Sequence, residues 1–314
     1  MRLVFLGTPN FASQCLEKIL SKHQVAAVVT APDKPKGRGM KVEPSEVKLL
    51  AQERGLDILQ PINLKDSEFL KKLSFYKADL FCVVAFRILP EEVFTMPPKG
   101  CINLHGSLLP KYRGAAPINW AIINGERETG LTTFFIRRAV DTGDIILQEK
   151  ILIGPEETFG ELYERMAELG GETLIKTIDL IETNSVSLSS QDNNQATPAP
   201  KLTPEIGKID WIMKAEAVHN LVRGLSPKPG AYSFLKGKKV IVLRTRLTRL
   251  DSVGKRPGEV LQADPQKGII IACGEGSVEI LELKPESGKV ITGAEFVRGH
   301  RLIAGEVFEQ RIGN

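Results

Sequence analysis

The stretch Cys101-Ile-Asn-Leu-His-Gly-Ser-Leu-Leu-Pro-Lys-Tyr-Arg-Gly-Ala-Ala-Pro-Ile-Asn-Trp120 begins as a short apolar strand and then breaks into a loop rich in glycine and proline. Because residues two apart in a strand point to the same face, Asn103 and His105 are predicted to project together at the end of this strand. Ligands of α/β proteins often bind where a strand gives way to a loop. The stretch therefore predicts an acyl-transfer site, although the two side chains could equally cap nearby backbone groups.

On either side of this stretch, strand and helix patterns alternate, which predicts a Rossmann-like, doubly wound and mostly parallel α/β sheet. Apolar and β-branched runs predict strands at residues 3–7, 25–30, 80–86, 102–105, 131–136 and 145–153. Thr158 and Glu161 have capping-box spacing ahead of a long amphipathic helix, which Gly170 and Gly171 are expected to break or ease.

The chain has 314 residues, which exceeds the usual size of one hydrophobic core, so we expect two domains. The first is predicted at residues 1–189, followed by a polar linker at 190–206 without apolar periodicity and a second domain at 207–314. In the second domain a short helix near 216–223 precedes short strands at 232–235, 240–247, 258–262, 268–272 and 278–283. This pattern predicts a small OB-like β-barrel, an architecture that often presents a face to nucleic acid.

The composition is that of a soluble globular protein, with 42% hydrophobic and 25% charged residues. The N-terminal apolar run is too short for a signal peptide, and no stretch reaches the roughly 20 apolar residues of a membrane span. We therefore expect a cytoplasmic protein, and a monomer. Cys15, Cys82, Cys101 and Cys273 form no CxxC pair and lie in apolar segments, which predicts reduced, buried thiols rather than disulfides or a zinc site.

The net charge of +4 is concentrated in the C-terminal part of the chain. Residues 190–314 carry 19 basic and 14 acidic side chains, whereas residues 1–189 carry 23 and 24. Within 228–256, nine basic side chains accompany a single acidic residue, Asp251, a local excess that suits a polyanion. Taken alone, such a charge run is more often a solvated face.

Two further segments carry candidate functional groups. Asp141 lies in a glycine-containing turn, from which it could orient the His105 imidazole and stabilise its protonated form, or simply form an Asx-turn. The apolar run Val83-Val-Ala-Phe-Arg-Ile-Leu-Pro90 leads into a loop. Its backbone could bind a flat heterocycle in an apolar slot, or the run is only a buried strand end.

Together, Asn103, His105, Ser107-Leu-Leu-Pro110, Arg113-Gly-Ala-Ala-Pro117 and Asp141-Thr-Gly-Asp144 resemble the 10-formyltetrahydrofolate-dependent formyltransferases. The resemblance covers nearly the whole chain and includes Pro32-Asp-Lys-Pro-Lys-Gly-Arg-Gly-Met-Lys41, Ile209-Asp-Trp211 and Pro229-Gly-Ala231. It implies that Asn103, His105 and Asp141 are the catalytic group, that 10-formyltetrahydrofolate is the formyl donor and that no metal is needed. The folate-binding residues that it implies are Phe86, Arg87, Ile88, Leu89, Ser107, Leu108, Leu109, Pro110, Val140, Thr142, Gly143 and Asp144.

Within this family the chain is most similar to members that formylate the methionine carried by initiator tRNA, for translation initiation. The similarity implies that the loop with Lys34, Lys36, Arg38 and Lys41 meets the acceptor end of the tRNA. The basic barrel strands would contact tRNA phosphates through Lys236, Lys238, Lys239, Arg244 and Arg246.

Two alternatives stay open at this point. The first is a formyltransferase that acts on an amino sugar nucleotide with the same three polar residues. It would need a sugar-nucleotide pocket rather than a basic loop and barrel. The second is an RNA-binding protein without catalytic activity on the same fold, against which the presence of Asn103, His105 and Asp141 argues.

Overall fold

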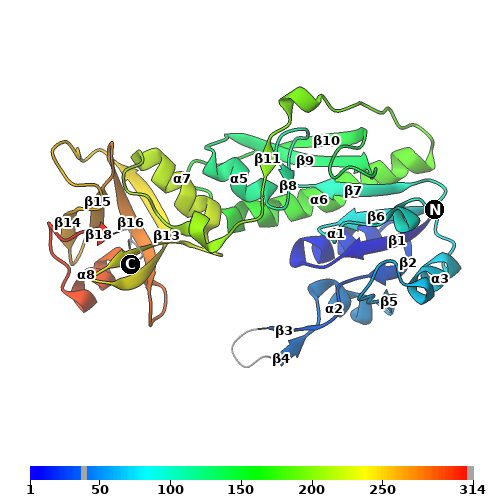
Figure 1. Cartoon of the computed structure of the whole chain (residues 1–314), viewed down its shortest axis with the longest axis horizontal. Coiled ribbons are helices and arrows are strands. Elements are labelled where there is room, and N and C mark those ends of the chain that lie inside the picture. Colours follow the sequence, from blue (N-terminus) through cyan, green and yellow to red (C-terminus); the bar gives the residue numbers. More distant parts are fainter. Residues whose placement is uncertain (37–40, 310–314) are drawn as a thin grey trace. The chain divides into compact units, whose positions relative to one another are not determined.

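The computed structural model describes residues 1–36 and 41–309, which form two compact units (Figure 1). The first unit comprises Met1–Pro117, Thr129–Ile151 and Tyr163–Pro200. The second comprises Lys201–Asn314 together with two segments from the first half of the sequence, Ile118–Glu128 and Leu152–Leu162. Among the described residues, no helix is long and apolar enough to cross a membrane.

A seven-stranded sheet forms the centre of the first unit, in the order β10-β9-β7-β6-β1-β2-β5. Its strands are β1 (Arg2–Gly7), β2 (Gln24–Val29), β5 (Asp57–Leu59), β6 (Leu80–Val84), β7 (Cys101–His105), β9 (Glu128–Phe135) and β10 (Ile145–Leu152). The neighbouring strands β5 and β2, β2 and β1, β1 and β6, and β6 and β7 pair in parallel. β7 pairs with β9 in the antiparallel direction. The predicted fold class, a mostly parallel α/β sheet with a C-terminal barrel-like sheet, is confirmed.

Helices cover both faces of this sheet, because the strands bury apolar side chains on both sides. The first unit contains α1 (Asn10–Leu20), α2 (Glu46–Glu53), α3 (Ser67–Phe75), α4 (Glu91–Phe94) and most of α6 (Phe159–Glu182), whereas α5 (Pro117–Ile123) belongs almost wholly to the second unit. On one face, Val4 and Leu6 of β1 pack in one cluster with Phe69 of α3 and Val93 of α4. The short pieces are β3 (Lys34–Lys36), β4 (Lys41–Glu43), β8 (Arg113–Gly114), η1 (Asn193–Gln195) and β11 (Pro198–Ala199).

The expectation that Gly170 and Gly171 break the long helix is wrong, because α6 runs without interruption from Phe159 to Glu182. The two glycines instead allow α1 to approach α6 closely. A Cβ atom on Gly170 would lie 2.9 Å from Leu104 Cδ2 and 3.1 Å from Cys15 Sγ, and one on Gly171 would lie 2.6 Å from Lys18 Cβ. The absence of a side chain is therefore a packing requirement, which overrides the low helix propensity of glycine.

The second unit is built on a curled antiparallel sheet in the order β14-β15-β16-β13-β12-β18, with β17 paired to β16. Its elements are η2 (Pro204–Gly207), α7 (Ala215–Leu225), β12 (Ala231–Leu235), β13 (Lys238–Thr248), β14 (Val260–Asp264), β15 (Gly268–Ala272), β16 (Ser277–Pro285), β17 (Ile291–Thr292), α8 (Gly293–His300) and β18 (Phe308–Glu309). A bridge between Glu259 and Val307 and a hydrogen bond from Val260 N to Glu306 O join the two ends of the sheet. The sheet thus curls back on itself, as the predicted OB-like barrel requires.

The two early segments are held to α7 within the second unit by buried polar contacts. Asn119 Nδ2 donates to Gly224 O at 2.8 Å, and the buried Arg223 donates through Nη1 to the carbonyl oxygens of Gly154 and Glu157. His219 Nε2 lies 3.1 Å from Pro155 O. These bonds satisfy polar groups that would otherwise be buried without a partner.

All four cysteines are buried and free, as predicted. Burial raises the pKa of Cys82 and of Cys273 to about 12. Both thiols are therefore protonated at neutral pH, a form that is neither a nucleophile nor a metal ligand.

We predict that Gly171→Ala destabilises the protein, although alanine is the better helix former. The added Cβ would meet Lys18 Cβ, which is fixed to the α1 backbone, so the two helices must separate. Overpacking costs about 1–3 kcal/mol and the gain in helix propensity is about 0.5–1 kcal/mol, which leaves a loss of up to about 2 kcal/mol. Urea unfolding measures this loss, with Glu172→Ala at the adjacent exposed position as a near-neutral control. Equal stability of the two variants would contradict the packing argument.

Candidate active site

Asn103 and His105 lie on β7, a strand that has β6 on one side and β9 on the other. Asn103 is aligned with Val83 of β6 and Phe134 of β9. Its side chain is partly exposed, and among the described residues its amide makes no hydrogen bond. His105 ends the strand and is buried, with 6% of its surface exposed. The strand thus offers a partly exposed amide two residues from a fixed imidazole.

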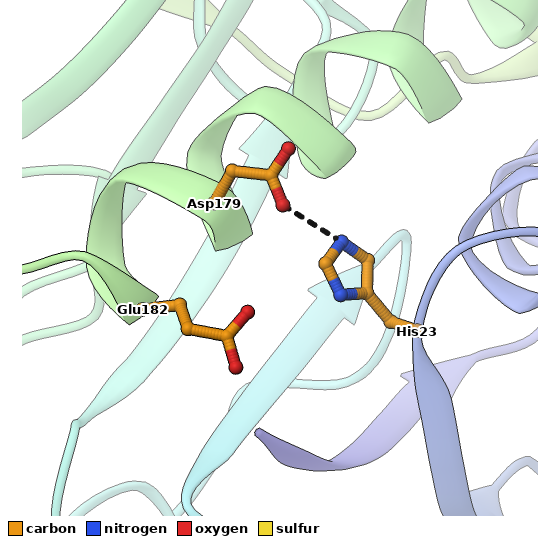
Figure 2. A group of neighbouring side chains, drawn as sticks. All are labelled: His23, Asp179 and Glu182. Carbon is orange, nitrogen blue, oxygen red and sulfur yellow. Dashed lines mark ion pairs between the residues drawn. The ribbon is translucent and has the colours of Figure 1, made fainter.

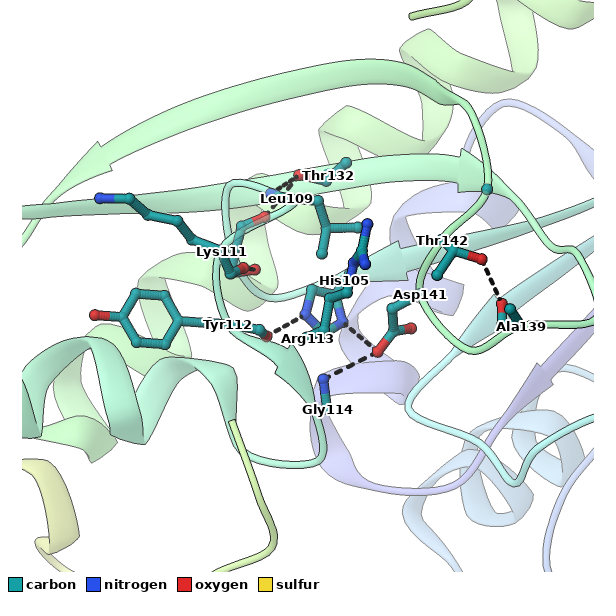
Figure 3. Close-up of polar contacts among 12 residues, drawn as sticks. His105, Leu109, Lys111, Tyr112, Arg113, Gly114, Thr132, Ala139, Asp141 and Thr142 are labelled. Carbon is teal, nitrogen blue, oxygen red and sulfur yellow. Dashed lines mark hydrogen bonds and ion pairs between the residues drawn. The ribbon is translucent and has the colours of Figure 1, made fainter. Parts of the chain in front are cut away.

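The His105 imidazole lies between a backbone carbonyl and a carboxylate (Figure 3). Its Nε2 is 2.8 Å from Tyr112 O, and because a carbonyl oxygen only accepts, Nε2 carries the hydrogen of this bond. On the other side, Nδ1 is 3.9 Å from Asp141 Oδ2, which is an electrostatic contact rather than a hydrogen bond. Among the described residues, Nδ1 is therefore the His105 nitrogen that makes no hydrogen bond.

Asp141 belongs to the loop that joins β9 to β10, and its backbone has a positive φ of 54°. Its Oδ2 accepts a hydrogen bond from Gly114 N at 3.0 Å. Gly143 is indispensable for this loop path, because a Cβ at that position would lie 1.7 Å from the carbonyl oxygen of Phe135. Thr142 Oγ1 donates to Ala139 O, and the Asp144 carboxylate pairs with Arg137. The loop is thus fixed by its own turn contacts and places Asp141 beside the imidazole.

The loop after β7 is anchored by the buried hydroxyl of Thr132 (Figure 3). Thr132 Oγ1 donates to Ser107 O at 2.6 Å and accepts from Leu109 N at 3.1 Å. Gln148 Nε2 adds hydrogen bonds to Thr132 Oγ1 and to Leu109 O. Ser107 Oγ donates to Lys111 O, and the side chain of Leu108 packs over Gly130 of β9. Ser107, Leu108, Leu109 and Pro110 therefore follow one defined path away from the strand.

The third loop, residues 85–90, follows β6. Arg87 donates through Nη1 to Ile62 O and through Nη2 to Pro61 O, and its guanidinium lies 5.2 Å from the centre of the Phe86 ring. The side chain of Leu89 is part of the hydrophobic core, whereas that of Ile88 is 76% exposed. Val140, on the loop that carries Asp141, is 53% exposed. Two apolar side chains on the predicted folate-binding loops are therefore open to solvent.

The segment predicted as a linker contributes contacts to this site that the sequence does not reveal. Gln191 Nε2 donates to Asp141 O and Gly143 O, and its Oε1 accepts from Arg113. Thr197 Oγ1 accepts from Tyr112 N at 2.9 Å. β11 pairs in parallel with β8, which extends this support to the backbone of Arg113 and Gly114. The polar composition of the segment is typical of both a linker and a loop support, so composition gives no signal for this role.

Four of the five basic barrel residues predicted to contact RNA have partners within their own unit. Lys236 lies 2.9 Å from Glu306, Arg244 lies 2.7 Å from Glu161 and Arg246 lies 2.7 Å from Glu279. Lys239 Nζ is 3.8 Å from the centre of the Tyr232 ring, and Lys238 is exposed.

In the basic loop, Lys34 is exposed and starts the short hairpin of β3 and β4, in which positions 36 and 41 are paired. Arg38 and the side chains of Lys36 and Lys41 lie outside the described residues.

Comparison with known proteins identifies the family. The sequence matches the family described as formyl transferase over residues 1–178 and the formyl transferase C-terminal domain over residues 201–301. It is 45% identical to the methionyl-tRNA formyltransferase of Acetivibrio thermocellus, over 99% of this chain and 100% of that protein. The chain belongs to the methionyl-tRNA formyltransferase family. The family predicted from the sequence is thereby confirmed, together with formyl transfer as the type of reaction.

A second relative in the methionyl-tRNA formyltransferase family, from Porphyromonas gingivalis, is 47% identical over 96% of each chain. Solved structures with the same fold are more distant. WlaRD, a sugar 3N-formyl transferase solved with dTDP and 5-N-formyl-THF, has a TM-score of 0.67 at 20% identity, over 92% of this chain and 99% of its own. The N-formyltransferase of Helicobacter canadensis, in complex with folinic acid and dTDP-3-aminofucose, has a TM-score of 0.66 at 23% identity, over 88% and 97%. These likenesses concern the fold.

Proposed function

We propose that the protein transfers a formyl group from 10-formyltetrahydrofolate to the α-amine of methionyl initiator tRNA, for translation initiation. The observation that carries this proposal is a partly exposed Asn103 amide on the same strand as a fixed His105 imidazole, in a chain whose full-length relatives bear that enzymatic name. An amide that donates hydrogen bonds and an imidazole that moves protons are the two groups that acyl transfer to an amine requires.

The donor fits the loops around β7. Formyl folates combine a flat, polar heterocycle with an apolar aromatic linker, so their sites need backbone hydrogen-bonding groups beside apolar side chains. The loops at 85–90, 107–110 and 139–144 supply both, because Ile88 and Val140 expose apolar surface next to backbone that other side chains hold in place. We assign the folate site to these loops, with the Leu89 side chain supporting it from the core.

In the reaction, the neutral amine attacks the formyl carbon, a C–N bond forms and the carbonyl electrons move onto oxygen. Asn103 Nδ2 donates to this oxyanion, an interaction whose loss typically costs about 10²–10³ in rate. The intermediate collapses as the bond from carbon to folate N10 breaks. His105 takes the proton from the attacking nitrogen on Nδ1 and returns it to N10, while Tyr112 O holds the ring through Nε2 and Asp141 stabilises the imidazolium.

The acceptor is tested by supplying the purified protein with 10-formyltetrahydrofolate and three substrates in parallel. We expect rapid formylation of methionyl initiator tRNA, little of methionyl elongator tRNA and none of a dTDP-linked amino sugar. Formylation of the amino sugar in preference to the tRNA would instead indicate a formyltransferase that acts on amino sugar nucleotides. Folate binding without turnover on any acceptor would instead favour an RNA-binding protein on an inactive enzyme fold.

For the catalytic group, we predict that Asn103→Ala and His105→Ala each slow single-turnover formyl transfer by about 10²–10³-fold. Equilibrium binding of the folate, measured alongside, should change far less, because neither side chain belongs to the proposed folate loops. Wild-type rates in both variants would refute the mechanism. Asn119→Ala is a matched control. It removes another side-chain amide, one that donates to Gly224 O of α7 and is not part of the proposed site.

We further propose that the basic face of the barrel contacts tRNA phosphates through Lys236, Lys238, Lys239, Arg244 and Arg246. Lys238 is exposed and Lys239 lies over the Tyr232 ring, so these two can bind a phosphate most readily. Lys236, Arg244 and Arg246 each have a carboxylate partner. Exposed ion pairs contribute only about 0–1 kcal/mol, so a phosphate can compete with the carboxylate for the same cation.

Replacing Lys236, Lys238 and Lys239 together by alanine should flatten the salt dependence of tRNA binding. Each lost phosphate contact lowers the slope of log Kd against log salt concentration by roughly one, so we expect a decrease of about two to three. Filter binding over a range of KCl concentrations measures the slope. The control replaces Lys22, Lys71 and Lys72, three exposed lysines of the first unit, by alanine with the same change in net charge. The same slope in both triple variants would contradict the proposal that the barrel face contacts tRNA phosphates.

A further inference from the structure

His23 has a buried nitrogen that lacks a hydrogen-bond partner. The residue lies in the turn between α1 and β2, and only 7% of its side chain is exposed. Its Nε2 is fully buried and forms no hydrogen bond to any residue that the structure describes, yet it faces Asp179 Oδ1 at 3.3 Å (Figure 2). A buried polar atom without a hydrogen bond destabilises the folded protein, so its position calls for an explanation.

Two carboxylates near the end of α6 lie close to the His23 imidazole. Asp179 and Glu182 are three residues apart, which places both on one side of the helix (Figure 2). Their side chains are 54% and 44% exposed, so a solute can reach them. One ligand atom from each of the three residues can be chosen so that all lie within 4.8 Å of one another.

We propose that His23, Asp179 and Glu182 bind a divalent transition-metal ion of the Zn²⁺ or Co²⁺ type. One imidazole nitrogen with two carboxylate oxygens is a ligand set that zinc accepts, with water in the remaining position. Mg²⁺ and Ca²⁺ instead prefer oxygen ligands throughout, so the histidine selects against them. The ion would bind the buried Nε2, which in the protein alone has the electrostatic contact with Asp179 but no hydrogen bond.

Two positively charged groups, the α-amine of Met1 and the ammonium of Lys99, lie near the cluster and affect how its carboxylates can bind a metal ion. Glu182 Oε1 accepts from the α-amine of Met1 at 2.5 Å, so its second oxygen is the one available to a metal. Lys99 Nζ donates to Ile181 O and to Asn184 Oδ1. Because these two cations repel a metal ion, we expect both carboxylates to be needed for binding.

The position of the cluster indicates a structural role. His23 immediately precedes β2, and β2, β1, β6 and β7 are successive parallel neighbours. The amino end of β2 therefore lies at the sheet edge opposite to the end of β7 where His105 sits. A metal ion here would tie the α1–β2 turn to the end of α6 without touching the reacting groups.

The test uses the full chain, stripped of metal with a chelator and then titrated with Co²⁺ by visible absorption and with Zn²⁺ by calorimetry. We expect one ion per chain and a rise in melting temperature upon binding. His23→Gln and Asp179→Asn should each weaken binding at least about tenfold and abolish the rise in melting temperature. Both variants should retain formyl-transfer activity.

Glu172→Gln on the same helix and His300→Gln on α8 are matched controls, and they should bind metal like the unchanged protein. Asp179→Asn alters an exposed side chain, so it keeps the test decisive even where His23→Gln unfolds the turn. The absence of saturable binding, or unaltered affinity in His23→Gln and Asp179→Asn, would overturn the proposal and leave the three residues as an ion-pair cluster only. Neither result bears on the proposed formyl transfer.

Discussion

The hydrogen bond from His105 Nε2 to Tyr112 O is the constraint on which the rest of the site depends. It can form only when the chain leaves β7, turns through residues 107–111 and brings the Tyr112 carbonyl back to the end of its own strand. Thr132 fixes the start of this turn and Thr197 fixes its end, through hydrogen bonds to Leu109 N and Tyr112 N. The orientation of one imidazole is thus set by three separate parts of the chain.

Much of this arrangement could be predicted from the sequence, because it depends on local pattern. Alternation in residues 101–105 places Asn103 and His105 on one face, and apolar runs mark the neighbouring strands. The contacts of Gln191 and Thr197 could not be predicted, since they join positions roughly 50 to 85 residues apart in a segment with no periodicity. The residues around either partner of a long-range hydrogen bond carry no local sequence pattern that predicts it.

Gly170 and Gly171 show the converse case, in which a local rule gives the wrong answer. Low helix propensity predicts a break, but propensity differences are at most about 1 kcal/mol per residue and tertiary packing exceeds them. The charge pattern of the barrel is a similar case. Sequence composition counts Lys236, Arg244 and Arg246 as excess positive charge, whereas the fold brings Glu306, Glu161 and Glu279 to them from distant positions.

The second unit includes two segments, Ile118–Glu128 and Leu152–Leu162, that precede it in the sequence by many residues. Asn119, Gly154 and Glu157 are bonded to α7 as if they were part of the C-terminal chain. A gene fusion that joins this barrel to another catalytic domain at residue 200 would therefore leave Arg223 and His219 without the carbonyl groups that they bind. Exchange of C-terminal domains between such enzymes thus requires that these interior segments change together with the C-terminal part, which constrains how the two halves of the gene can recombine.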